Sequence, residues 1–329
     1  MPELPDLEDY LAAMRVRMVG ATITRVRIAG ISLLRTYDPP VDGLVGRRVT
    51  DLHRCGKRLV WEVRPGCGAD GGSDHGPQPD DDAVLSDDGP WYVILHLMIA
   101  GRLRWLGPDA DPPGRIGLAA FGFTTPDGGR SPGGTLVVTE AGTKKRASLH
   151  LVRGRAALAD HDRGGIEPLE ADRAAFEEQL LLENRTLKRV LTDQRRYAGI
   201  GNAFSDEILH AAGLSPVRRT RNLDAEEIAR LHAAVQQVLG TWIARLRETT
   251  GDGFPEKVTA FREGFAVHGR FQQPCPVCGT EVQRIRYAEN EVNYCPRCQT
   301  GGAVLADRSM SRLLKDDRPR TIEELEDRG

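Results

Sequence analysis

Short segments in which hydrophobic and polar residues alternate occupy most of the first 140 positions of the chain. Alternation of this kind, interrupted by Gly and Pro clusters, is typical of β-strands with one buried face. The predicted strands are Thr22–Ala29, Arg48–Arg54, Arg58–Val63, Trp91–Met98, Leu103–Trp105, Ile116–Phe123 and Thr135–Thr139. One helix precedes them, with Asp6 as its expected N-cap and its end near Val19. A single helix followed by many short strands predicts a β-sandwich or flattened barrel.

The pattern changes after about Pro168, where hydrophobic residues recur with the spacing of amphipathic helices. The predicted helices are Ala174–Leu182, Thr186–Asp193, Ile200–Ala212 and Ala225–Arg247. Asp224 is the expected N-cap of the last one. The turn Gly199–Asn202 leads into the third helix, whose N-terminal N–H groups could bind an anion. By itself, such a sequence is more often a tight turn than a phosphate site.

Two Cys-x-x-Cys pairs close to the C-terminus give the strongest chemical signal in the chain. They are Cys275 with Cys278 and Cys295 with Cys298. Each pair directs two thiolates at one point, so together they can supply the four vertices of a tetrahedral zinc site. The alternative is two disulfides or redox pairs, which would suit a secreted protein. A site closed by four cysteines is structural, so we expect one structural Zn²⁺ per chain.

The ribbon around these cysteines is predicted to have strands at Glu281–Tyr287 and Val292–Tyr294. Gly279 is expected to adopt a positive φ where the chain turns back after the first pair. The two other cysteines, Cys55 and Cys67, are expected to be free thiols, which fits a reducing compartment.

Composition narrows the class of protein without identifying a partner. The 329 residues are 40% hydrophobic and 28% charged, as in soluble globular proteins, and their length suggests two domains or more. The formal net charge of −2 counts against a strongly basic nucleic-acid binder. Much of the acid, however, lies in a Gly- and Asp-rich stretch at 65–90 and in the C-terminal tail, where a short helix is expected at Ser309–Lys315. Without a signal-like N-terminus or a long apolar segment, an intracellular protein is expected.

Four features taken together resemble the formamidopyrimidine-DNA glycosylase/endonuclease VIII family. They are the N-terminal Pro2–Pro5, the segment His53–Lys57, the run from Gly199 to Leu209, and the four-cysteine ribbon preceded by Val267–Arg270. The resemblance extends from Pro2 to about Gln299 and omits the 65–90 insertion and the tail. It implies an α+β multidomain fold with a flanking helix on an N-terminal β-sandwich, a helix–two-turn–helix domain and a zinc β-ribbon. The expected divisions are 1–165, 166–264, 265–300 and a tail at 301–329.

The resemblance implies a catalytic role for three residues. Removal of Met1 would expose Pro2 as a secondary amine, which can attack C1′ of a damaged nucleotide and form an iminium without further protonation. An α-amino group also ionises near neutral pH, unlike an ordinary lysine. Glu3 would act as general acid and base. Lys57 matches the family lysine at the phosphate beside the lesion. Without the other motifs, Pro2–Pro5 would be an unremarkable terminus and Lys57 a solvated surface lysine.

Six further residues are expected to contact DNA. Asn202 matches the family asparagine that binds a phosphate, although Asn is also common in turns for conformational reasons. Arg270 and Lys188 are additional candidate phosphate contacts, and such contacts position a duplex without reading its sequence. Ile99 takes the place of the methionine that fills the gap left by an extruded base. Lys144 and Lys145 lie in the segment that replaces the family's wedge of Arg and Phe.

The chain departs from the family pattern at three positions that probe DNA. Asn290 replaces an arginine five residues before the third zinc cysteine, and Arg284 or Arg286 is a candidate substitute. Ile99 replaces the methionine, and Glu140–Ala147 replaces the Asp-Pro-Arg-Arg-Phe-Gly loop. The reaction class is therefore better supported than the substrate.

Two functions remain open at this point. The first is a bifunctional glycosylase and AP lyase of base excision repair, acting on oxidised, ring-opened or otherwise damaged bases in double-stranded DNA. The second is a catalytically weak protein that binds abasic or distorted sites. The combination of Pro2, Glu3 and Lys57 favours the enzyme. We expect a monomer without a membrane partner, located in the cytoplasm and associated with the nucleoid in a bacterial cell.

Overall fold

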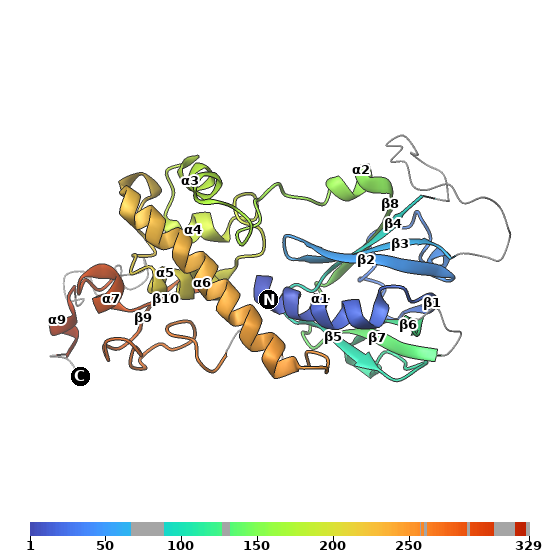
Figure 1. Cartoon of the computed structure of the whole chain (residues 1–329). Helices are drawn as coiled ribbons and strands as arrows, with labels where there is room; N and C mark the ends of the chain where they lie inside the picture. Colours follow the sequence, from blue (N-terminus) through green and yellow to red (C-terminus); the bar gives the residue numbers. More distant parts are fainter. Residues whose placement is uncertain are drawn as a thin grey trace. The chain divides into compact units, whose positions relative to one another are not determined.

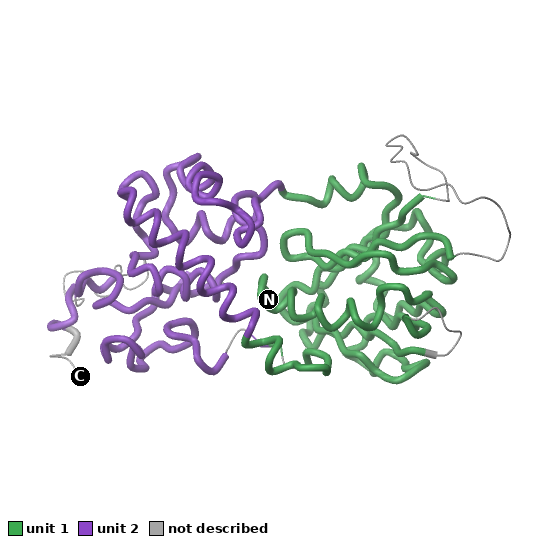
Figure 2. Tube along the Cα trace, in the orientation of Figure 1, with its two compact units in different colours: residues 1–163, 245–258 green, residues 164–244, 259–329 purple. Residues whose placement is uncertain are grey.

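The computed structural model describes residues 1–66, 89–126, 132–256, 258–259, 262–287, 290–305 and 320–326 (Figure 1). The 65–90 insertion, Cys67 and the helix expected at Ser309–Lys315 therefore lie largely or wholly outside the described residues. The chain forms two compact units (Figure 2). The first contains residues 1–163 and 245–258, and the second contains residues 164–244 and 259–329.

The first unit contains two four-stranded antiparallel sheets and one long helix, α1 (Leu4–Met18) (Figure 1). One sheet has the order β2-β3-β4-β8 and the other β1-β6-β7-β5. The strands are β1 (Ile23–Ile28), β2 (Arg47–Cys55), β3 (Arg58–Pro65), β4 (Trp91–His96), β5 (Gly101–Leu106), β6 (Gly117–Thr124), β7 (Pro132–Glu140) and β8 (Ser148–Arg153). The predicted sandwich with a flanking helix is confirmed.

The core of this unit lies between the inner faces of the two sheets and extends under α1. Trp61 of β3 packs edge-on against Phe121 of β6, with ring centroids 5.1 Å apart. Leu7 and Met14 on α1 are fully buried in the same cluster. Removal of these aromatic and aliphatic side chains from water is the main favourable contribution to folding of the sandwich.

The start of α1 differs from the sequence prediction. The N-cap is Glu3, and Asp6, the expected N-cap, instead occupies position N3. The Glu3 N–H donates to Asp6 Oδ2 at 2.8 Å, which is the reciprocal half of a capping box. Pro5 fits within the first turn because its missing N–H would have no helical partner there. The helix therefore begins directly after the candidate catalytic residues.

Strand β8 and the short helix α2 (Gly154–Ala159) were not predicted. The β8 segment alternates for only six residues, with Leu149 and Leu151 inward and polar side chains between them, so its signal was weak. It forms a strand because it pairs with β4 along the sheet edge, with Leu149 opposite Leu95.

The second unit is helical and ends in the ribbon. Its helices are α3 (Arg173–Leu181), α4 (Leu187–Thr192), α5 (Asn202–Ala211) and α6 (Ala225–Thr250), whose last residues belong to the first unit. Asp224 caps α6 as predicted, because its Oδ1 accepts from Glu227 N at 2.8 Å and Glu227 Oε2 accepts from Asp224 N at 3.1 Å. The ribbon contains β9 (Gln283–Arg286), β10 (Glu291–Tyr294) and α7 (Pro296–Thr300), and α9 (Ile322–Glu326) follows.

None of the helices in the described ranges is both long enough and apolar enough to cross a membrane.

Candidate functional site

The candidate catalytic residues of the first unit are buried at the beginning of the chain. Pro2 is buried, and Glu3 is only 4% exposed. Lys57 is 8% exposed and lies in the turn between β2 and β3, where Gly56 adopts a φ of 57°. A buried proline, carboxylate and ammonium are unusual at a surface terminus, since charged groups are seldom buried without a reason. Their burial distinguishes them from a solvated terminus and a surface lysine.

The electrostatic environment of the chain start favours a neutral amine. Burial lowers the pKa of the Met1 ammonium below its ordinary value, and the positive charges of Arg102 and Lys57 lower it further. The carboxylates of Glu3 and Asp6 act in the opposite direction. Burial and these positive charges therefore favour the neutral form of the amine at the start of the chain.

Arg102 was not among the site residues predicted from the sequence. The available signal was a charged residue beside the predicted strand Leu103–Trp105. Its Nε donates to Val258 O at 2.6 Å, and its Nη1 donates to Ile99 O at 3.0 Å. The side chain thus holds the turn after β4, in which Met98 has a φ of 52°. Ile99 is 60% exposed on this turn. Ile99 is therefore exposed to solvent on a turn whose backbone is held by a hydrogen bond from Arg102.

A cluster of basic side chains next to Lys57 was also missed. His96, at the end of β4, has its pKa lowered to about 4 by burial and by the charges of Arg58 and Lys57. His150, on the adjacent strand β8, also has its pKa lowered to about 4, by burial and by His161 and Arg58. Both histidines are therefore neutral at pH 7, and the positive charge here belongs to Lys57 and Arg58. The His-Leu motif at 96 was the available sequence signal.

The segment 141–147 is folded around one buried carboxylate. Glu140 is almost fully buried, and its carboxylate accepts from Arg146 N at 2.9 Å and Ala147 N at 3.1 Å. The Lys145 ammonium donates to Glu140 O. Of the two lysines in this segment that were predicted to contact DNA, Lys145 is therefore turned back onto its own loop, and Lys144 is exposed.

In the second unit, Asn202 is the first residue of α5, after a turn held by Gln194. Gly199 has a φ of 83°, its N–H donates to Gln194 Oε1 at 2.9 Å, and Gln194 Nε2 donates to Ile200 O at 2.7 Å. Asn202 Nδ2 donates to Glu291 O of β10 at 2.9 Å. The asparagine thus connects the helix start to the ribbon.

Lys188 and Arg270, both predicted to contact phosphates, are engaged within the protein. Lys188 is 8% exposed, and its Nζ donates to Asn202 O at 2.6 Å and to Asp206 Oδ1 at 2.5 Å. The Arg270 guanidinium donates to Phe265 O, Pro274 O and Gln273 Oε1 at 2.9–3.1 Å. Lys188 therefore positions Asn202, and Arg270 closes the loop that leads into the ribbon.

Two buried acids on α5 hold the start of the ribbon. Asp206 Oδ2 accepts from His268 Nδ1 at 2.7 Å and from Asn293 N at 3.2 Å. The Glu207 carboxylate accepts the backbone N–H groups of Ala266, Val267 and His268 at 2.7–2.9 Å. Burial raises the pKa of Glu207 despite these three hydrogen bonds. These two acids lie in the run from Gly199 to Leu209, and the sequence alone predicted no role for them.

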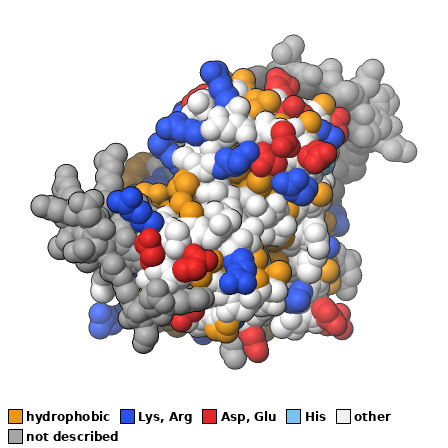
Figure 3. All heavy atoms as spheres, turned by 90° about the vertical axis from the view of Figure 1, so that its left-hand side faces the viewer, with side chains coloured by type: hydrophobic (Ala, Val, Ile, Leu, Met, Phe, Trp, Pro, Cys, Tyr) orange, Lys and Arg blue, Asp and Glu red, His pale blue; other side chains and the backbone are white. Residues whose placement is uncertain are grey.

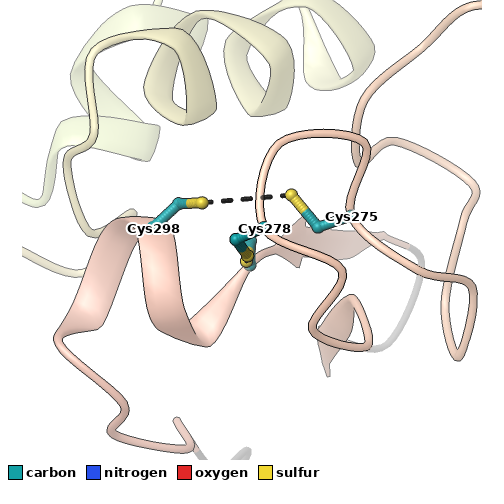
Figure 4. A group of neighbouring side chains, drawn as sticks. Cys275, Cys278 and Cys298 are labelled. Carbon is teal, nitrogen blue, oxygen red and sulfur yellow. Dashed lines mark hydrogen bonds between the residues drawn. The ribbon is translucent and has the colours of Figure 1, made fainter.

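The four cysteines of the ribbon form a zinc site. Figure 4 shows three of them, Cys275, Cys278 and Cys298, with their side chains directed toward one another. Their sulfur atoms all lie within 4.8 Å of one another, with Cys275 Sγ to Cys298 Sγ at 3.9 Å and Cys278 Sγ to Cys295 Sγ at 3.3 Å. A tetrahedral Zn²⁺ with Zn–S bonds of about 2.3 Å needs sulfurs roughly 3.8 Å apart, so the donor set fits the ion. Gly279 has the expected positive φ of 76°. His210 Nε2 of α5 lies 3.3 Å from Cys275 Sγ.

Comparison with known proteins identifies the family. The family model for the formamidopyrimidine-DNA glycosylase N-terminal domain matches residues 1–139. The model for the H2TH domain of the same enzyme matches residues 165–252, and the zinc finger found in FPG and IleRS matches residues 272–301. A formamidopyrimidine-DNA glycosylase of Heliobacterium modesticaldum is 30% identical over 91% of this chain and 100% of its own length. The chain belongs to the formamidopyrimidine-DNA glycosylase family.

Other relatives place the chain among the divergent members of this DNA-repair family. An uncharacterised formamidopyrimidine-DNA glycosylase-like protein of Mycobacterium tuberculosis is 46% identical over 39% of this chain and 80% of its own length. Among solved structures, a complex of the Lactococcus lactis Fpg with DNA containing an abasic site has a TM-score of 0.70 at 23% identity, covering 91% of this chain and 99% of the other. At that identity, the likeness establishes the fold.

The ribbon has no arginine at the position where the family resemblance places one, and one of the two candidate substitutes is engaged within the ribbon. Asn290 occupies the family's arginine position, and its carbonyl accepts from Tyr287 N at 2.7 Å. Arg284, one candidate substitute, lies over the Phe271 ring at 4.1 Å and pairs with Glu291 Oε2 at 3.3 Å. Arg286, the other candidate, is exposed.

Loss of one zinc ligand should unfold the ribbon. Cys278→Ser removes a thiolate from a site whose metal contributes on the order of 10 kcal/mol to folding of such small units. We expect the variant to lose zinc, measured by metal analysis, together with DNA affinity. Cys55→Ser, which removes a thiol outside the site, is the control and should retain zinc. Normal DNA binding by zinc-free protein would show that the ribbon does not contribute to binding.

The ion pair of Lys188 with Asp206 should be a major determinant of stability in the second unit. Asp206→Asn leaves the Lys188 ammonium buried without a counter-charge, which should cost about 3–5 kcal/mol in urea unfolding. Adding Lys188→Met removes the uncompensated charge and should recover part of the loss. The matched control is Glu291→Gln at the partly exposed pair with Arg284, where a change below about 1 kcal/mol is expected. Equal effects of the two single substitutions would contradict this assignment.

Proposed function

We propose that this protein is a bifunctional DNA glycosylase and AP lyase of base excision repair that acts on damaged double-stranded DNA. The observation that carries the proposal is the buried chain start: Pro2 and Glu3 are buried, and burial lowers the pKa of the amine of Met1, the residue directly before Pro2. A protein that only binds DNA has no use for a buried secondary amine of this kind. The family membership supports the glycosylase step, and the amine supports the lyase step.

The proposed reaction begins after Met1 has been removed. The Pro2 nitrogen attacks C1′ of the damaged nucleotide, the bond from C1′ to the base breaks, and the base leaves with the proton that the Pro2 nitrogen gives up. Glu3 donates a proton to the sugar ring oxygen, which opens the ring and leaves a positively charged iminium between Pro2 and C1′. The iminium acidifies C2′, a proton is removed there, and the bond from C3′ to its phosphate oxygen breaks. Hydrolysis of the iminium then releases the enzyme.

The proposed DNA contacts are few and local. Lys57 is the candidate ligand of a phosphate near the nucleophile, and Lys144 is an exposed candidate on the 141–147 segment. In the second unit, Asn202 begins a helix of ten residues, whose N-terminus favours a phosphate. Lys188 and Arg270 support this DNA contact by positioning the helix start and the loop. Solved structures of the Lactococcus lactis Fpg are complexes with DNA that contains an abasic site or Fapy-dG, which supports damaged DNA as the ligand.

Such contacts need not form a broad basic surface. On the face of the molecule shown in Figure 3, basic and acidic side chains are interspersed and neither sign dominates. This agrees with the formal net charge of −2. We propose that the protein binds DNA as a monomer through these local contacts, inside the cell.

Borohydride trapping on abasic DNA tests the nucleophile. The native protein should give a covalent adduct, because borohydride reduces the iminium to a stable amine. Pro2→Gly, and a protein retaining Met1, should trap much less DNA. On a duplex that carries a damaged base, Glu3→Gln should lower the rate of base excision by roughly 10²–10⁴, with DNA binding within a few fold. Trapping by the Pro2 variant equal to that of the native protein would refute Pro2 as nucleophile, and an absent native adduct would favour the catalytically weak DNA-binding protein.

The preferred lesion should depend on Ile99 and the segment 141–147, which replace the residues that probe DNA in the family. Ile99 is branched at Cβ and adapts poorly to an irregular gap, and the segment 141–147 has no aromatic ring to stack. Extruding a well-stacked base should therefore be costly, and substrates that are already unstacked should be favoured. We expect faster single-turnover cleavage at abasic sites than excision of 8-oxoguanine opposite cytosine, at equal salt. The reverse order would mean that another loop supplies the wedge.

A further inference from the structure

We propose that Tyr287, at the end of β9, is a stacking platform for an unpaired nucleobase. The inference rests on the proposed function in taking DNA as the ligand, and it adds a specificity-determining residue. It assigns to the ribbon a preference for unstacked or single-stranded nucleotides over intact duplex.

Tyr287 is an aromatic side chain that the fold leaves in water. Its exposed fraction is 58%, and within the described part of the chain Tyr37 is the other exposed aromatic side chain. The remaining tyrosines there, such as Tyr294 in the neighbouring strand, are fully or nearly fully buried. Every nucleobase has an aromatic face, so an exposed ring beside a basic residue is the usual composition of a site for unpaired bases. Arg286, directly before Tyr287, is exposed and supplies the basic residue.

The backbone that carries Tyr287 is held in place. Its N–H donates to Asn290 O at 2.7 Å, which closes the hairpin, and Arg286 pairs with Glu291 across the two strands. Glu291 O accepts from Asn202 Nδ2 at 2.9 Å, so the hairpin is fastened to α5. A ring on a preorganised hairpin loses little conformational entropy when a base stacks on it.

Neither position 290 nor Arg284 offers a guanidinium to a nucleotide at this hairpin, which leaves the contact to the aromatic side chain. Asn290 cannot provide a guanidinium, and the Arg284 guanidinium is engaged with the Phe271 ring and the Glu291 carboxylate. Stacking differs from a phosphate contact in a measurable way. It releases no condensed counterions, so it contributes to affinity without contributing to the salt dependence of binding.

The test measures the affinity of full-length, zinc-loaded protein for three probes of one sequence over a series of salt concentrations. The probes are a single strand, a duplex with an abasic-site analogue, and a fully paired duplex. Tyr287→Ala should weaken binding of the single strand and of the abasic duplex about tenfold. Its affinity for the fully paired duplex should stay within about twofold of that of the native protein. The slope of log K against log salt concentration should be unchanged. Tyr287→Phe should bind like the native protein. Arg286→Gln should instead reduce that slope by about one unit or less.

Val277→Ala is the matched control, because Val277 is an apolar side chain of the same ribbon with 73% exposure. It should leave all three affinities within about twofold. Zinc content and thermal midpoint should be unchanged in every variant. The inference is overturned if Tyr287→Ala binds the single strand like the native protein, or loses paired and unpaired probes equally. If native protein traps abasic DNA while Tyr287→Ala changes nothing, only this inference fails; if native protein binds none of the probes, the proposed function fails with it.

Discussion

The buried carboxylate of Asp206 is the interaction on which the organisation of the second unit depends. It neutralises Lys188 from α4, accepts from His268 in the loop before the ribbon, and accepts from Asn293 in β10. Its neighbours on α5 extend the same connection, because Asn202, Glu207 and His210 reach β10, the preceding loop and Cys275 respectively. Positions separated by four and eight residues lie on one side of a helix, so α5 presents a polar side to the ribbon. A buried carboxylate is costly unless fully paired, and here the pairing joins three segments distant in sequence.

The zinc ion and α5 therefore both determine the conformation of the ribbon. Zinc fixes the cysteine turns, whereas α5 fixes the hairpin through backbone groups that no metal reaches. A small ribbon buries too little apolar surface to be stable alone, and its buried residues here form two small clusters, one of Ile285, Val292 and Tyr294 and one that includes Val282 and two zinc cysteines. Hydrogen bonds to a rigid helix therefore orient the hairpin tip, where Tyr287 and Arg286 are exposed.

The sequence was sufficient to predict features determined by local spacing. The zinc site follows from the positions of four cysteines, the capping of α6 follows from Asp224, and seven strands of the sandwich follow from alternation. Features that depend on tertiary partners were not predictable. Strand β8 exists because β4 offers an unpaired edge, and Glu3 rather than Asp6 caps α1 because the chain start is buried there. Lys188 looks like a surface lysine until the fold places Asp206 beside it, and Arg102 gained importance only through the turn that it holds.

The basic residues that the structure engages internally bear on how this protein can hold DNA. Lys188, Arg270 and Lys145 each donate to acceptors within their own unit, so a shift of these side chains to phosphates would first break existing hydrogen bonds. Affinity gained from counterion release scales with the number of phosphates neutralised, so each cation held within the protein is one fewer for that purpose. In the function proposed here, recognition then depends more on the placement of a few groups: Pro2 and Lys57, the helix start at Asn202, and the aromatic ring of Tyr287. Such a distribution favours lesions that present an accessible sugar and an unpaired base over intact duplex, since intact duplex offers mainly its phosphates.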